Sequence, residues 1–383
     1  MIIEIPLNEF GERIKKVQRV MQRENLDSLL VFSNEAEPYY VRYFADYWPA
    51  FETTAVMIPK SGDPALLIGP EAGTFARSRS KIPSVLSLAD FRESSQPDYP
   101  GAKLTTWNDV FDQFPTNRLG LAGFHMFPHT IFENMKNALG EKEVVDADYA
   151  VREVMLIKTA AEIACLRESA RISELGFKAV VENIKPGMTE VQVVSLATAA
   201  ILDAGAEAVG YPLWCCSGPN STQAISRPSL RKIQKGEFIH VQIGAKVSGY
   251  STSVSRPIVL GKATEDMRRF MQMGCDAENL TIELMRAGTP ASEVAQKVHG
   301  YIKERGYGDT ILYGPAHGCG QMECEWPFVE TNSTFVLKEN MTFHADMFLA
   351  NKEMGFRFED CIVIRDGAPA EELSNYKREV IVI

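Results

Sequence analysis

The chain has 383 residues and a formal net charge of -10. A single hydrophobic core rarely extends beyond about 250–300 residues, so this length predicts more than one domain. The negative charge disfavours binding to nucleic acid or to an anionic membrane surface, because both would repel the protein.

Targeting and redox signals indicate a cytoplasmic protein. No stretch approaches the roughly 18 consecutive apolar residues of a transmembrane helix, so we expect no membrane contact. Residues 1–16 lack the continuous apolar run of a signal peptide. The seven cysteines follow no regular spacing, which is typical of free thiols in a reducing compartment.

The first 150 residues alternate between helical and strand patterns. Residues 9–25 carry apolar side chains at helical spacing, and residues 28–32 form a short apolar run that predicts a buried strand. Strand-like runs at 54–58 and 65–68 are separated by a Gly-Asp-Pro turn signal. This alternation predicts an α/β domain over residues 1–150.

From residue 151 the pattern changes to long helices followed by β-rich segments. Residues 185–191 (KPGMTEV) resemble residues 286–294 (RAGTPASEV), and each lies between two helical stretches that precede a β-rich segment. This internal sequence similarity predicts a duplicated domain. A coincidental pair of glycine-containing helix connections is the alternative.

Four segments of the C-terminal half combine strand patterns with polar residues. They are residues 241–253 (VQIGAKVSGYSTS), 316–320 (AHGCG), 341–346 (MTFHAD) and 355–360 (GFRFED). In order and spacing they resemble the pita-bread family of creatinase, prolidase, aminopeptidase P and methionine aminopeptidase. Residues 12–13, 39–44 and 152–163 resemble the family's first domain and its junction, so the resemblance covers nearly the whole chain.

The resemblance implies an α+β protein in two parts. A creatinase-type N-terminal α/β domain would span residues 1–150, and a pita-bread catalytic domain would span residues 151–383. Because relatives are commonly homodimers, it also implies a homodimer.

Two of the family's five metal-ligand positions carry neutral residues here. The family's Asp, Asp, His, Glu and Glu ligands fall on Gln242, Ser253, His317, Asp346 and Glu359. Two neighbouring divalent cations need several carboxylates, some of them bridging, and neither Gln nor Ser supplies one. We therefore predict that the chain holds no metal, with one divalent metal at His317, Asp346 and Glu359 as the alternative.

Substrate-facing positions also differ from those of relatives. The loop histidine that precedes the first ligand strand falls near Ile225, and the histidine that follows the His-Gly-x-Gly motif becomes Cys324. Creatinase and ectoine hydrolase, which belong to this group, act without metals on C–N bonds of small molecules. The resemblance therefore favours a metal-independent C–N hydrolase of a small metabolite such as an amide, a cyclic amidine or a ureido compound.

The catalytic hypothesis assigns four residues. Cys324 would be the nucleophile, with its pKa lowered by a neighbouring base, and His317 would act as acid and base. Asp346 and Glu359 would orient the imidazole. An activated water is an alternative nucleophile. Cys324 could also have no catalytic role and pack as a small buried apolar side chain.

Further residues are candidates for substrate binding. His240 and His344 each lie two residues before a ligand position, so each shares a sheet face with it. The predicted substrate-binding residues are His240, Gln242, Ser253, His344, Tyr43 and Trp326. Two other functions remain open: a mononuclear Xaa-Pro metallopeptidase, and a pseudoenzyme that binds a peptide or metabolite without turnover.

Overall fold

The computed structural model describes residues 3–383 and divides into two compact units. The N-terminal unit comprises Pro6–Leu156, and the C-terminal unit contains Ile157–Ile383. The N-terminal unit extends past the predicted boundary at residue 150 because helix α6 (Asp148–Met155) buries Val151 and Met155 in its core.

The N-terminal unit is built on a six-stranded sheet with the order β4-β3-β2-β1-β5-β6. Its strands are β1 (Ser28–Ser33), β2 (Thr54–Pro59), β3 (Ala65–Ile68), β4 (Val85–Ser87), β5 (Arg118–Ala122) and β6 (Glu143–Asp146). Its other helices are α1 (Leu7–Arg23), α2 (Tyr39–Ala45), α3 (Gly73–Arg79), α4 (Trp107–Gln113) and α5 (His129–Leu139). Along β1, Leu29 and Val31 enter one hydrophobic cluster, whereas Leu30 and Phe32 enter another. Both faces are therefore covered, which explains the continuous apolar run in the sequence.

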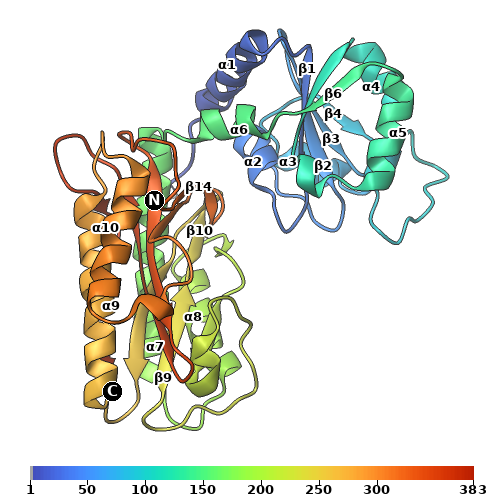
Figure 1. Cartoon of the computed structure of the whole chain (residues 1–383). Helices are drawn as coiled ribbons and strands as arrows, with labels where there is room; N and C mark the ends of the chain where they lie inside the picture. The colour runs from blue at the N-terminus through green and yellow to red at the C-terminus, as the bar shows by residue number, and fades with distance from the viewer. Residues whose placement is uncertain (1–2) are drawn as a thin grey trace. The chain divides into compact units, whose positions relative to one another are not determined.

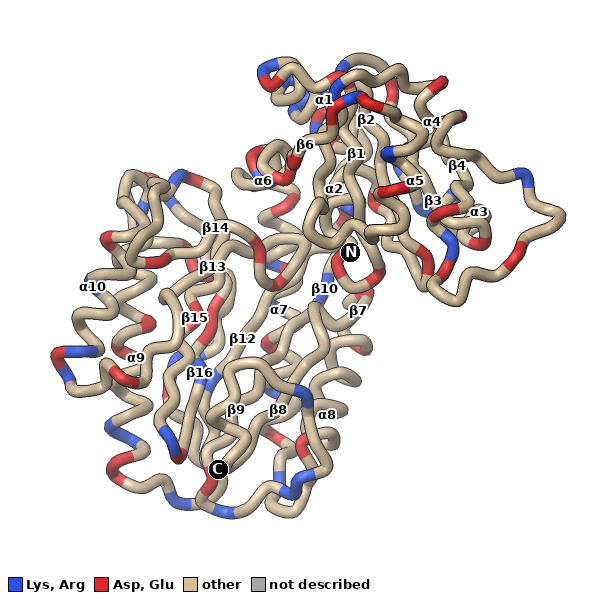
Figure 2. Tube along the Cα trace, turned by 45° about the vertical axis from the view of Figure 1, so that its right-hand side comes forward, with Lys and Arg blue, Asp and Glu red and all other residues tan. Residues whose placement is uncertain are grey.

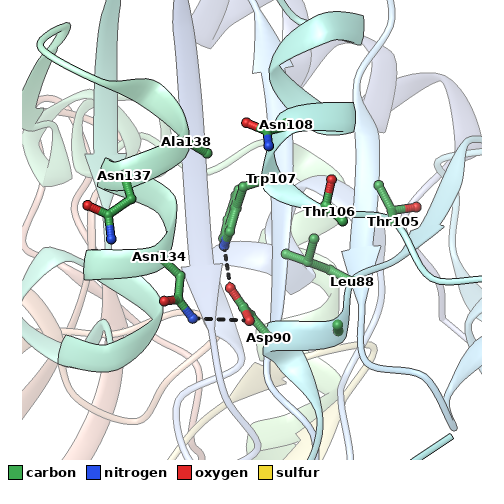
Figure 3. Close-up of a pocket in the computed structure, with 10 residues that line it drawn as sticks. Leu88, Asp90, Thr105, Thr106, Trp107, Asn108, Asn134, Asn137 and Ala138 are labelled. Carbon is green, nitrogen blue, oxygen red and sulfur yellow. Dashed lines mark hydrogen bonds between the residues drawn. The ribbon is translucent and has the colours of Figure 1, made fainter.

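A pocket of the N-terminal unit lies beside helices α4 and α5 (Figure 3). Its central acid, Asp90, accepts hydrogen bonds from Trp107 Nε1 at 2.7 Å and from Asn134 Nδ2 at 3.2 Å. Both carboxylate oxygens are thus used to join the segment around residue 90 to two helices, and we assign this pocket a structural role.

The C-terminal unit contains a nine-stranded sheet whose main path runs β14-β13-β15-β16-β12-β9-β8, with β17 on β16 and β18 on β12. These strands are β8 (Trp214–Ser217), β9 (Phe238–Ile243), β12 (Val254–Val259), β13 (Ala316–Gly318), β14 (Glu325–Val329), β15 (Thr342–Ala350), β16 (Gly355–Val363), β17 (Glu371–Glu372) and β18 (Ile381–Val382). A small sheet is formed by β7 (Ala208–Val209), β10 (Ala245–Val247) and β11 (Tyr250–Ser251).

Two helix pairs accompany this sheet (Figure 1). The first is α7 (Ala160–Asn183) with α8 (Glu190–Asp203), and the second is α9 (Glu265–Leu284) with α10 (Ala291–Glu304). The connections match in detail: Gly187 and Gly288 both have φ of +89°, in the left-handed region that favours glycine. The backbone N–H of Gly187 donates to the carbonyl oxygen of Ile233 at 2.8 Å, and that of Gly288 donates to the carbonyl oxygen of Leu337 at 2.9 Å. The structure thus repeats the connection whose internal sequence similarity predicted a duplication.

Helices α7 and α9 cover the same face of the nine-stranded sheet. Val241 of β9 belongs to the cluster that contains Phe177 of α7, and Phe356 of β16 packs edge-on against Phe270 of α9 with ring centroids 4.7 Å apart. Because side chains alternate along a strand, the neighbours of these residues point to the opposite face. That opposite face carries the polar residues described below.

A buried ion-pair network ties the central strands together on the helix side. Arg256 of β12 and Asp360 of β16 are fully buried, and Arg256 Nη2 donates to Asp360 Oδ1 at 2.8 Å. Arg378 donates to the other oxygen of Asp360 at 2.8 Å. Among residues 3–383, no helix is both long enough and apolar enough to cross a membrane.

We predict that Arg256→Met destabilises the C-terminal unit by about 3 kcal/mol, because Asp360 would keep its buried charge with only one guanidinium partner. Hydrogen exchange of the β12 and β16 amides measures this free energy. The control is Arg269→Gln, which removes a solvent-exposed pair with Asp266 and should leave exchange unchanged. Equal protection in the two variants would contradict the prediction.

Candidate active site

Strand register brings the polar residues of four segments onto one face of the sheet. His317 of β13 pairs with His344 of β15, and His344 pairs with Cys361 of β16. Two residues further along β15, Asp346 pairs with Glu359 of β16. Glu359 pairs in turn with Ser255 of β12, which pairs with Gln242 of β9. Residues more than 100 positions apart in sequence are therefore neighbours in space, and the acidic and basic positions of β15 and β16 can be followed in Figure 2.

His317 directs its second ring nitrogen, Nε2, at two carboxylates. Its Nδ1 lies 3.1 Å from the carbonyl oxygen of Gly318, and because a carbonyl can only accept, Nδ1 carries the ring proton in the neutral imidazole. The lone pair of Nε2 then faces Glu323 Oε1 at 3.6 Å and Asp346 Oδ2 at 3.8 Å. A positive charge stabilises this arrangement, either as a proton on Nε2 or as a cation that replaces that proton.

Glu323 is a site residue that the sequence analysis missed. It lies in the connection between β13 and β14, next to Cys324, and its side chain is 16% exposed. Its Oε1 accepts a hydrogen bond from Gln242 Nε2 at 3.5 Å and lies 3.4 Å from His344 Nδ1. The only sequence signal was its place beside Cys324, because Glu323 does not fall on any family ligand position.

His344 links the carboxylates to the position of a missing ligand. Its Nε2 accepts the backbone N–H of Ser253 at 3.0 Å, so the proton of the neutral ring lies on Nδ1. Nδ1 in turn lies 3.4 Å from both Glu323 Oε1 and Glu359 Oε1. The Ser253 hydroxyl is hydrogen-bonded to the Tyr211 hydroxyl at 2.7 Å. The backbone N–H and the hydroxyl of Ser253 are thus both hydrogen-bonded to side chains other than the carboxylates.

Buried acidic and basic groups are concentrated in the site. Glu359 is fully buried, and burial together with the charges of Asp346 and Glu323 raises its pKa well above the ordinary value. Gln242 donates a hydrogen bond to Glu359 Oε2. Arg357 is the nearby guanidinium, 3.4 Å from Asp346 Oδ1 and 3.7 Å from Glu359 Oε2. This guanidinium thus faces two carboxyl groups of the site.

The remaining predicted residues lie in three different surroundings. Cys324 is exposed, and although burial opposes it, the contact with Cys324 raises the pKa of His317 to about 10. His240 is fully buried, and burial lowers its pKa to about 3; its ring packs edge-on against Phe348. Trp326 is 44% exposed. Tyr43 belongs to the N-terminal unit, where it is 2% exposed and donates to the carbonyl oxygen of Val154.

The residues present fit one divalent cation. Ligand atoms of His317, Glu323 and Glu359 lie within 4.8 Å of one another, in a group that also contains a nitrogen of His344. Since His344 Nε2 accepts the Ser253 N–H, His344 is adjacent to the cation position without being a ligand. Glu359 Oε1 is buried and has no hydrogen-bond partner among residues 3–383, and an orphaned carboxylate oxygen is what a cation would satisfy. A pair of cations does not fit the family positions, because Gln242 and Ser253 contribute no charge.

Comparison with known proteins identifies the family. Residues 164–366 match metallopeptidase family M24, and residues 13–156 match the creatinase/prolidase N-terminal domain. The chain belongs to metallopeptidase family M24. Over 374 residues it is 26% identical to an Xaa-Pro dipeptidase of Pyrococcus furiosus, covering 97% of this chain and 99% of the relative.

Solved structures agree on the fold. The X-Pro aminopeptidase of Thermotoga maritima superposes with a TM-score of 0.84 at 19% identity, covering 97% of this chain and 99% of that one. The prolidase of Pyrococcus horikoshii gives 0.83 at 23% identity, covering 97% and 100%. The predicted α+β pita-bread fold with a creatinase-type first domain is confirmed, as is the prediction of a hydrolase acting on C–N bonds.

Two predictions are wrong. The metal-independent hydrolase of a small metabolite and the absence of a cofactor are overturned by relatives that are Xaa-Pro dipeptidases in a metallopeptidase family. The count of carboxylates at family positions did not include Glu323, whose Oε1 lies 3.6 Å from His317 Nε2. The alternative of a mononuclear Xaa-Pro metallopeptidase agrees better with these findings.

We predict that restoring both carboxylates, in the double variant Gln242→Asp and Ser253→Asp, raises the bound metal from one towards two ions per chain. Two anions would then offset the repulsion between two cations. Metal analysis after dialysis against Mn²⁺ gives the stoichiometry. Thermal unfolding provides the control, since the double variant without metal should melt below the unaltered protein and should recover when Mn²⁺ is added. An unchanged stoichiometry would contradict this account.

Proposed function

We propose that this chain is a mononuclear metallopeptidase that hydrolyses the peptide bond of Xaa-Pro dipeptides or similarly short peptides. His317, Asp346 and Glu359 would hold one divalent cation. The observation that carries the proposal is the convergence of the His317 Nε2 lone pair with the carboxylates of Asp346 and Glu323, at 3.8 and 3.6 Å. The full-length similarity to Xaa-Pro dipeptidases supports the choice of substrate.

A bound cation would polarise the peptide carbonyl and lower the pKa of a bound water. The surrounding residues would hold the ligands in place. Gly318 fixes the His317 tautomer through its carbonyl oxygen, and the Tyr313 hydroxyl donates to Asp346 Oδ2 at 2.9 Å. Such outer contacts orient metal ligands and tune their affinity.

The substrate would approach from the connection that carries Cys324 and Trp326, both exposed. Cys324 occupies the place of a histidine in relatives and contacts His317, so we assign it to the substrate side of the site. His240, Gln242, Ser253 and His344 lie deeper and would shape the floor of the site. Assembly as a homodimer and a cytoplasmic location remain predictions.

We predict that protein stripped of metal by a chelator is inactive on Xaa-Pro dipeptides and regains activity when Mn²⁺, Co²⁺ or Zn²⁺ is added. His317→Asn should lower kcat/KM by more than the about 10–100-fold that loss of an outer contact costs. A release assay for free proline measures both effects.

The matched control is His129→Gln, because His129 begins helix α5 in the N-terminal unit and should leave activity unchanged. Dipeptides without proline test the substrate class. Full activity in the presence of chelator would contradict the proposal, as would binding of metal and dipeptide without any turnover.

A further inference from the structure

Glu323 supplies negative charge at a site whose family positions have lost it. We propose that Glu323 is a metal ligand that this chain has gained from the connection between β13 and β14, in compensation for the carboxylates absent at Gln242 and Ser253. The inference rests on the proposed function, since it concerns the same cation. It adds a residue that the family positions do not include.

The contacts of Glu323 place its carboxylate beside the ring nitrogens of two histidines, where a metal ligand would lie. Its Oε1 lies 3.6 Å from His317 Nε2 and 3.4 Å from His344 Nδ1, and both imidazoles are buried. The side chain is 16% exposed, so most of its hydration is lost. A carboxylate buried to this degree is stable only when it is paired or coordinates a metal.

The connection that carries Glu323 is held in place before any ligand binds. The buried amine of Lys246 donates to the carbonyl oxygen of Gln321 at 2.9 Å. The backbone N–H of Met322 donates to Glu325 Oε1 at 3.0 Å, and Glu325 pairs with the buried Lys158 at 3.5 Å. These anchors flank position 323 on both sides, so Glu323 enters the site from a fixed backbone.

His344 positions the carboxylates and is outside the ligand set. Its Nε2 accepts the Ser253 N–H, so Nδ1 carries a proton and has no lone pair to offer a cation. The remaining set is one imidazole nitrogen, of His317, and the carboxylates of Glu323, Asp346 and Glu359. A set dominated by oxygen suits Mn²⁺, and its single nitrogen is also compatible with Co²⁺ and Zn²⁺.

A second cluster provides a rival location for the ion. Cys319 and Cys361 are fully buried with their sulfurs 3.5 Å apart, and their ligand atoms lie within 4.8 Å of a His344 nitrogen. Thiolates select softer ions such as Zn²⁺ and Cu⁺. Co²⁺ distinguishes the two locations, because thiolate ligands give an intense near-ultraviolet charge-transfer band that oxygen and nitrogen ligands do not.

The test is a Co²⁺ titration of the full chain after chelator treatment, followed by calorimetry and by absorption spectroscopy. Glu323→Gln, of nearly equal shape, should weaken Co²⁺ binding by at least about tenfold and shift the visible Co²⁺ spectrum. Glu323→Asp should retain intermediate affinity. The matched control is Glu330→Gln, since Glu330 is an exposed carboxylate at the end of β14 and should bind Co²⁺ like the unaltered protein.

Circular dichroism and thermal unfolding establish that each variant is folded. Unaltered Co²⁺ affinity and spectrum in Glu323→Gln would overturn the role of Glu323 and leave the proposed function intact. A thiolate band in the unaltered protein that disappears in Cys361→Ser would place the ion at the sulfur cluster and also overturn the inference. Failure of the unaltered protein to bind any of the three cations would defeat the proposed function itself.

Discussion

The C-terminal unit is organised around a buried cluster of carboxyl groups and imidazoles whose charges must be balanced. The Gly318 carbonyl fixes the His317 proton on Nδ1, so the Nε2 lone pair faces the carboxylates of Glu323 and Asp346. Repulsion among such groups is costly where burial removes water. Arg357 offsets part of it from one side, and a divalent cation would offset the rest.

The nine-stranded sheet makes this concentration of charge possible. Its helix-covered face carries the buried Arg256–Asp360–Arg378 network among apolar side chains. Its other face collects the polar side chains that alternate with the apolar ones. Because Glu359 and Asp360 are adjacent in a strand, their side chains point to opposite faces of the sheet. Glu359 belongs to the candidate site, whereas Asp360 belongs to the buried ion-pair network.

A member of this family could bind a cation without carboxylates at two of the family's ligand positions if another residue supplied a carboxylate to the same site. Gln242 and Ser253 remove carboxylates from two family positions, yet Gln242 remains in the site as a donor to Glu359 and Glu323. Glu323 returns one carboxylate from a neighbouring connection. With Glu323 as the proposed ligand, the site would keep a carboxylate for a single cation although two family positions are neutral.

The sequence alone determined the fold and the strands that carry His317, Asp346 and Glu359, because apolar periodicity and ordered motifs are local signals. It also predicts that two ligand positions, at Gln242 and Ser253, are neutral. Only the tertiary structure brought Glu323 to His317 and turned His344 into a bridge between Ser253 and the carboxylates. The direction of the Glu323 side chain and the position of the proton on His344 depend on contacts between segments that are far apart in sequence. Local sequence patterns therefore do not predict them.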